Sequence, residues 1–220
     1  MSFLHNYDTY LCDLDGLLIN SLDRLSLSLV RAVSEHSNGE QLDEFKEYDK
    51  KNPGLSRFEK VEHFKKVILK DLKFDSNLIL HDFNRLSLIA RTGAYISPNI
   101  FKLHEQYREK NWILLTNCDN NQLSEVSKVF KLNLIFGENL IGTPPSKVVR
   151  AREIREIRSL DRVLSISDSE SDCLIAQENN FDFLFIEEFS RGNKDWIASN
   201  YFSVKSIEDL LLKKPITLIK

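Results

Sequence analysis

Short apolar runs bounded by polar or turn residues recur along the chain. They are residues 9–12 (TYLC), 112–116, 162–167, 181–186 and, more weakly, 201–204. Stretches with apolar side chains at helical spacing lie between them, for example residues 121–130 and 206–214. Strands that are buried on both faces are near-continuous apolar runs, and their alternation with helices is typical of a parallel sheet. The pattern predicts an α/β fold with a doubly wound parallel sheet.

Residues 20–92 interrupt this alternation. The segment contains amphipathic stretches, including residues 22–36 and 57–72, but no convincing strand. A helical block of about 70 residues is too long for an ordinary crossover, because such connections extend only a few residues beyond the helix. We therefore expect a core domain formed by residues 1–19 and 93–220, with an all-helical domain of residues 20–92 inserted into it.

The composition of the 220 residues excludes several classes of protein. Hydrophobic residues make up 42% of the chain, which is enough for one sizeable core and a small additional domain. The formal net charge is only -3, so no global field favours nucleic acid or an anionic membrane as a partner. The N-terminus does not have the pattern of a signal peptide, and no apolar run approaches the ~18 residues that span a bilayer. We expect a cytoplasmic protein, a monomer or homodimer, that acts on a small molecule.

Polar side chains stand where the predicted strands end. They are Asp13 and Asp15 after the first strand, Thr116 and Asn117 at the end of the second, Asp168 and Asp172 after the third, and Lys147 in a loop that opens a helix. Because ligands bind open parallel sheets at the carboxyl ends of the strands, we expect these groups to share one edge of the sheet.

Several carboxylates at one edge would repel each other unless a cation offset their charge. Oxygen ligands with room for water suit Mg²⁺, whereas the isolated histidines and scattered cysteines do not form a zinc site. A cation, the Lys147 ammonium and the Thr116 hydroxyl together would suit a bound phosphate. Taken alone, Asp15 and Gly16 could be an ordinary turn and Thr116 a helix cap. Their joint occurrence, in order, at the ends of predicted strands favours a shared site.

With these motifs the chain resembles the haloacid dehalogenase (HAD) superfamily, in its phosphatase branch with a helical cap, which includes proteins of the phosphoglycolate phosphatase and beta-phosphoglucomutase type. The matching stretches are DLDGLL at 13–18, WILLTN at 112–117, the lysine at 147 and SDSESD at 167–172. The resemblance covers nearly the whole chain. It implies a Rossmann-like core with an inserted all-helical cap domain, a Mg²⁺ cofactor and the hydrolysis of phosphoric monoesters.

The resemblance also implies a role for each aspartate. Asp13 would be the nucleophile that forms an aspartyl-phosphate, and Asp15 would be the general acid and then the general base. Magnesium would be held by Asp13, by the backbone carbonyl of Asp15 and by Asp168. Asp172 would be a further metal ligand or a support for the ligands.

The phosphoryl oxygens would be held by Thr116, Asn117 and Lys147. One departure lies in the fourth motif, which has Ser167 where glycine is usual. No residue that the motifs require for dephosphorylation is missing.

The inserted segment bears on substrate range. Asn20 and Leu22 stand where many relatives have Asp and Glu, at positions that lie at the mouth of the cap in those relatives. Residues 52–64 (NPGLSRFEKVEHF) are similar to a stretch of HAD proteins encoded among surface-polysaccharide genes. This similarity suggests that Arg57 and Lys60 contribute to substrate specificity, although an ordinary surface helix explains them equally well.

The sequence thus predicts a Mg²⁺-dependent phosphomonoester hydrolase for a small metabolite such as a sugar phosphate or a phosphoglycolate-like compound. Two alternatives stay open. A phosphomutase of the beta-phosphoglucomutase type shares all four motifs, and a catalytically silent protein could keep the fold as a binding module.

Overall fold

A computed structural model describes residues 3–53, 55–158, 162–191, 201–214 and 216–219. The chain divides into two compact units. One comprises Met1–Asn20 and Tyr95–Lys220, and the other comprises Ser21–Ala94.

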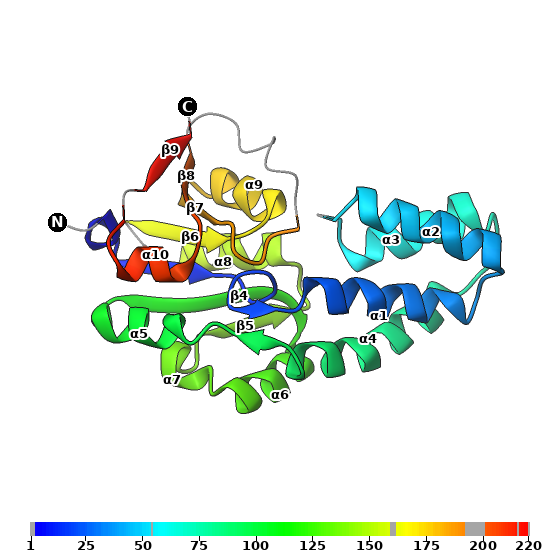
Figure 1. The fold of residues 1–220 in the computed structure, drawn as a ribbon, viewed down its shortest axis with the longest axis horizontal. Helices are drawn as coiled ribbons and strands as arrows, with labels where there is room; N and C mark the ends of the chain where they lie inside the picture. The colour runs from blue at the N-terminus through cyan, green and yellow to red at the C-terminus, as the bar shows by residue number, and fades with distance from the viewer. Residues whose placement is uncertain (1–2, 54, 159–161, 192–200, 215, 220) are drawn as a thin grey trace. The chain divides into compact units, whose positions relative to one another are not determined.

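The first unit contains a seven-stranded sheet in the order β5-β4-β1-β6-β7-β8-β9 (Figure 1). The strands are β1 Thr9–Cys12, β4 Asn111–Asp119, β5 Leu140–Thr143, β6 Val163–Ser167, β7 Asp182–Ile186, β8 Tyr201–Val204 and β9 Thr217–Ile219. All neighbouring strands are parallel except β9, which is antiparallel to β8. The predicted parallel α/β sheet is confirmed, with β1 third in the order, between β4 and β6.

The pattern of apolar runs missed the two outermost strands and the end of β4. β5 (LIGT) and β9 (TLI) each contain only two apolar residues, too few to stand out as an apolar run. β4 continues past Thr116 to Asp119, with a shift of register between Leu115 and Asp119. The strand was predicted to end too early because the polar residues Thr116 and Asn117 interrupt its apolar run.

Helices cover both faces of the sheet (Figure 1). They are α5 Asn99–Gln106, α6 Asn120–Phe130, α7 Asn133–Phe136, α8 Lys147–Arg158, α9 Glu170–Glu178 and α10 Ile207–Leu211, preceded by the 3-10 helix η1 Phe3–Asn6. Ala151 of α8, Ala176 of α9 and Leu11 of β1 belong to one hydrophobic cluster on one face of the sheet. Tyr10 and Trp112 make an edge-to-face aromatic pair, with ring centroids 4.8 Å apart. Alternation along β1 therefore turns odd-numbered side chains toward α8 and α9.

This alternation determines which polar residues face the two helices. Leu11 of β1 is the register partner of Ser165 in β6, so the next odd-numbered residues, Asp13 and Ser167, continue the same face. The Asp13 backbone N–H donates to the carbonyl of Ile166 at 3.1 Å, which extends the pairing by one residue. Asp13 and Ser167 consequently point toward the N-terminal ends of α8 and α9.

The chain leaves and re-enters the first unit through a small antiparallel pair, β2 (Ile19–Asn20) and β3 (Tyr95–Ile96). The second unit consists of α1 Leu22–Ser34, α2 Gly39–Lys51, α3 Arg57–His63, the π-helix η2 Phe64–Ile68 and α4 Ser76–Thr92. All of its described secondary-structure elements are helices, as the sequence predicts, and its hydrophobic core includes Phe45, Phe64 and Phe83. Gly54, part of the stretch at 52–64, lies outside the described residues. That this unit acts as a cap stays a prediction.

No helix within the described ranges is long and apolar enough to cross a membrane.

The helical unit contains a buried ion pair. The Lys60 Nζ lies 2.7 Å from Asp49 Oδ1, and the two side chains are 8% and 3% exposed. The Ser26 hydroxyl donates to the other oxygen of Asp49. These contacts join α1, α2 and α3, and they give the ammonium of Lys60 a partner within its own unit.

Replacing Lys60 with methionine should destabilise the protein by about 3–5 kcal/mol, because the Asp49 carboxylate would stay buried without its cation. The measurement is the free energy of unfolding in urea. The matched control is Lys46→Met, since Lys46 pairs with Asp43 at an exposed position, where the side chains are 48% and 75% exposed. That control should lose no more than about 0.5 kcal/mol. Equal losses in the two variants would show that the buried pair has no special role.

Candidate active site

The site begins in the tight turn that follows β1. Gly16 has a positive φ of 87°, a backbone conformation that other residues adopt only with strain. Its N–H donates to the carbonyl of Ile19 at 3.0 Å. A Cβ at Gly16 would overlap the carboxylate of Asp168, so the glycine also allows this acid to approach the turn closely. The sequence DLDG thus brings Asp13 and Asp168, which are far apart along the chain, to the same place.

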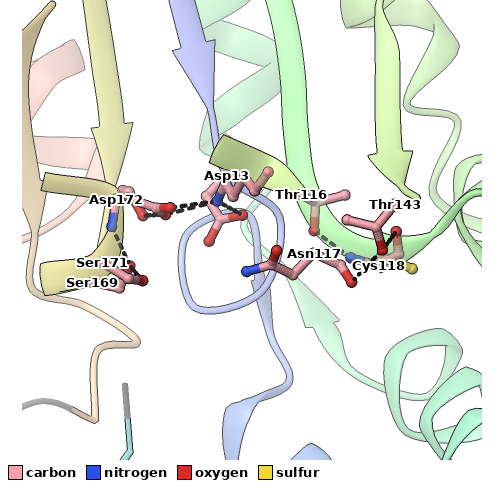
Figure 2. Close-up of polar contacts among 10 residues, drawn as sticks. Asp13, Thr116, Asn117, Cys118, Thr143, Ser169, Ser171 and Asp172 are labelled. Carbon is pink, nitrogen blue, oxygen red and sulfur yellow. Dashed lines mark hydrogen bonds and ion pairs between the residues drawn. The ribbon is translucent and has the colours of Figure 1, made fainter. Parts of the chain in front are cut away.

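The ammonium of Lys147 joins two of the predicted carboxylates. Lys147 is the first residue of α8, and its Nζ lies 2.8 Å from Asp13 Oδ1 and 2.7 Å from Asp172 Oδ1. The three side chains are only 5–11% exposed, so water screens these ion pairs weakly. Figure 2 shows Asp13 at the end of β1, with Asp172 beside it.

Asp172 is held by α9 and by the end of β6. Ser169 is the N-cap of α9, and its hydroxyl accepts the backbone N–H of Asp172 at 3.2 Å. The Ser167 hydroxyl donates to Asp172 Oδ2, and Lys147 Nζ is 2.8 Å from that same oxygen. The sequence Ser169-Glu170-Ser171-Asp172 has the S-x-x-D spacing of a helix N-terminus, a signal that could have identified Ser169 as a cap.

Buried negative charge dominates the electrostatics of the site. Burial raises the pKa of Asp13 to about 7; the Lys147 charge opposes this shift and the Asp172 charge adds to it. Burial also raises the pKa of Asp168 well above its usual value, and the charges of Asp13 and Asp172 raise it further. The pKa of Lys147 is raised although burial works against its charge, because Asp13 and Asp172 outweigh that effect. Lys147 therefore remains an ammonium.

The donor set fits a divalent cation of the magnesium type. Asp168 is 5% exposed and forms no ion pair with any residue in the described ranges, because Lys147 makes its direct contacts with Asp13 and Asp172. Within those ranges no three His, Cys, Asp or Glu side chains are arranged as a metal cage. Mg²⁺ does not need one, because it is usually bound by one or two carboxylates and several waters. Asp13, Asp168 and the backbone carbonyl of Asp15 would suffice.

Thr116 lies in the irregular part of β4, on the other side of β1 from β6 (Figure 2). Its side chain is buried, and its hydroxyl accepts the backbone N–H of Cys118 at 3.2 Å. Asn117 is exposed. The Thr143 hydroxyl donates to the carbonyls of Asn117 and Cys118 at 3.1 and 3.3 Å, which ties the end of β5 to β4. The sequence did not predict these contacts of Thr143, because the strand that carries it, β5, was not predicted.

Asp15 is half-buried within the turn, and its charge adds to the pKa shift of Asp13. The structure thus brings Asp13, Asp168, Asp172 and Lys147 together, with Asp15 two residues from Asp13. The contacts of Asp172 with Lys147 and Ser167 favour a supporting role over metal ligation.

Arg57 and Lys60 have partners inside the helical unit. The guanidinium carbon of Arg57 lies 4.6 Å from the ring centroid of Phe58 and 5.8 Å from that of Phe83, within the range of cation–π contacts. Lys60 is engaged in the buried pair with Asp49. These contacts account for both cations structurally, and their role in substrate specificity stays a prediction.

Comparison with known proteins gives a clear likeness of fold. No protein-family model matches the sequence, and no curated protein matches it either. A solved structure from Lactobacillus plantarum, of a protein assigned as a phosphoglycolate phosphatase, has a TM-score of 0.69 at 18% identity and covers 94% of this chain and 99% of its own. A haloacid dehalogenase-like hydrolase from Streptococcus pneumoniae has a TM-score of 0.64 at 17% identity, covering 96% and 92%.

A third similar structure contains a metal. It is YfnB of Bacillus subtilis, assigned as a HAD hydrolase and bound to magnesium, with a TM-score of 0.64 at 16% identity and coverage of 94% and 97%. The chain therefore has the fold of HAD-type hydrolases, which confirms the fold that the motifs imply. Identities this low show the fold alone.

The pKa shifts predict how stability depends on pH in metal-free protein. The pKa of Asp13 is raised from about 3.9 in the unfolded chain to about 7 in the folded one, so between these values the folded state binds more protons. The free energy of unfolding should therefore fall as the pH rises from about 4 to about 7, by at most about 1.4 kcal/mol per pH unit for this group. The measurement is the free energy of unfolding in urea, with EDTA present, at several pH values between about 4 and about 7.

Asp13→Asn should make this fall shallower, because the amide does not titrate. Asp43→Asn, which removes an exposed carboxylate of the helical unit, is the control and should leave the slope unchanged. An unchanged slope in Asp13→Asn would contradict the raised pKa of Asp13.

Proposed function

We propose that this protein is a Mg²⁺-dependent phosphomonoester hydrolase that works through an aspartyl-phosphate on Asp13. The observation that carries the proposal is the buried Asp13 carboxylate directly after β1, an interior strand of the sheet, paired with the Lys147 ammonium at 2.8 Å and followed two residues later by Asp15. A nucleophile of this kind needs a fixed position, a nearby cation and a neighbouring acid. Asp13, Lys147 and Asp15 meet these three needs.

The proposed reaction has two displacements at phosphorus. In the first, an oxygen of Asp13 attacks phosphorus while the bond to the leaving alkoxide breaks, and Asp15 gives its proton to that alkoxide. In the second, Asp15 takes a proton from a water whose oxygen attacks the phosphorus, and the bond to Asp13 breaks. The products are the alcohol and inorganic phosphate, and both aspartates return to their initial states.

The division of roles follows from position. The Lys147 ammonium favours the ionised form of Asp13, whereas the nearby charge of Asp168 opposes it. Asp13 therefore stays ionised when a bound cation offsets the charge of Asp168. Asp15 is a carboxyl two residues on, outside the Lys147 pair, and in our proposal it is the group that exchanges protons. Asp13, Asp168 and the Asp15 carbonyl would hold Mg²⁺, which when bound neutralises charge on the phosphoryl oxygens.

The remaining polar groups would bind the phosphoryl oxygens. Lys147 supplies positive charge beside Asp13, and the Thr116 hydroxyl and Asn117 would donate hydrogen bonds to the phosphoryl oxygens. In this proposal Asp172 supports Lys147. One neighbour in fold is assigned as a phosphoglycolate phosphatase, which supports a small phosphorylated metabolite, a sugar phosphate or a phosphoglycolate-like compound, as substrate.

Asp13→Asn should lower phosphate release by at least about a thousandfold, because an amide oxygen is a poor nucleophile. The assay is phosphate release from a panel of sugar phosphates, phosphoglycolate and nucleotides. EDTA should abolish the wild-type activity and added Mg²⁺ should restore it. Full activity in Asp13→Asn would overturn the mechanism.

The same panel separates the alternatives. An isomerised sugar phosphate with little free phosphate would indicate a phosphomutase. No turnover of any compound in the presence of Mg²⁺ would favour a silent binding protein.

Asp15→Asn should separate the two chemical steps. p-Nitrophenyl phosphate has a good leaving group that needs little protonation, so Asp13 should still be phosphorylated in this variant. The second step lacks its base and should slow by about 10²–10⁴-fold. The expected result is a rapid burst of nitrophenol, equal to the enzyme concentration, followed by slow turnover. Equal slowing of burst and steady state would argue against a base role for Asp15.

A further inference from the structure

Ser167 occupies a distinctive position at the end of β6. Its side chain is 1% exposed, and it faces the same side of the sheet as Asp13. Its hydroxyl donates to Asp172 Oδ2, while Lys147 contacts both oxygens of that carboxylate. A continuous chain of contacts therefore runs from Ser167 through Asp172 and Lys147 to Asp13.

We propose that Ser167 is a positioning residue that fixes the Lys147 ammonium relative to the reacting oxygen of Asp13. The proposal rests on the phosphatase function proposed above. A carboxylate bound only by a flexible lysine can turn about its last bond, and the lysine can move with it. The Ser167 hydroxyl is a second donor, which comes from a strand, and it holds the plane of the Asp172 carboxylate.

The position of the ammonium matters more in the transition state than in the bound substrate. Charge that develops on the phosphoryl oxygens is stabilised only by groups already in place, and a small displacement weakens that effect. Loss of the Ser167 hydroxyl should therefore lower kcat rather than raise KM. The serine stands where the resembling motif usually has glycine, which has no such donor.

The chain supplies a matched control in Ser165. This serine lies two residues earlier on the same face of β6 and is 6% exposed. Both serines line one small cavity of about 10 Å³ together with Lys147 and Asp172. Ser165→Ala removes a buried hydroxyl from the same environment but not the donor to Asp172.

The first test compares Ser167→Ala, Ser167→Thr and Ser165→Ala with p-nitrophenyl phosphate and Mg²⁺. Ser167→Ala should lose about tenfold in kcat with KM unchanged within about twofold, the size expected for one hydrogen bond to a charged group. Ser165→Ala should keep kcat within about twofold. Ser167→Thr restores the hydroxyl, with the cavity beside it to accept the methyl, and should recover most of kcat.

The second test does not depend on turnover. Ser167→Ala, Asp172→Ala and the double variant form a cycle in the unfolding equilibrium of metal-free protein, measured in urea. The two side chains should be coupled by about a factor of ten in the unfolding constant. If Asp172→Ala does not fold, Asp172→Asn takes its place, with a smaller coupling expected because the acceptor is neutral.

The outcomes distinguish this proposal from the function on which it rests. Equal kcat in Ser167→Ala and Ser165→Ala, a loss confined to KM, or no rescue by threonine would overturn the role of Ser167 while the wild type still releases phosphate. Absence of coupling in the cycle would overturn it as well. No phosphate release by the wild type would overturn the phosphatase function itself, and the catalytic role of Ser167 with it.

Discussion

The ion pairs of Lys147 are the interaction on which the candidate site depends. One ammonium, at the first residue of α8, meets a carboxylate after β1 and another in α9, and all three side chains are nearly buried. Burying a charge is costly unless it is paired, so each of these groups would be unstable in its place without the others. The need to satisfy them together explains why residues separated by 134 and 25 positions occupy one small region.

The single positive charge of Lys147 does not balance the negative charges around it. Asp13, Asp168 and Asp172 bring three carboxylates to a single lysine, and burial raises the pKa of Asp13 and of Asp168. A surplus of buried negative charge is a poor arrangement for stability but a good one for attracting a divalent cation and, with it, a phosphate. The same feature that weakens the metal-free fold is thus the one that would give the site its chemistry.

The surrounding fold supports this arrangement through ordinary secondary-structure rules. Side-chain alternation along β1 and β6 turns Asp13 and Ser167 to the face that α8 and α9 cover. The positive φ of Gly16 allows Asp168 to lie against the turn. The Ser169 cap fixes the start of α9, the helix that carries Asp172. Each element is weakly informative alone, and together they bring the carboxylates of Asp13 and Asp172 within hydrogen-bonding distance of the Lys147 ammonium.

The sequence by itself determined the elements and the chemistry of their ends. Apolar runs and helical spacing are local, so they predicted the inner strands, the helical unit and the acids at the strand ends. Only the tertiary structure decided which strands are neighbours and therefore which side chains meet. β5 and β9 each contain only two apolar residues and leave no signal, and the polar Thr116 and Asn117 within β4 hid its true end. Likewise, the contact of Ser167 with Asp172, and of both with Lys147, depends on strand order and register. Strand order and register are set by packing over the whole sheet, so no local sequence pattern predicts them.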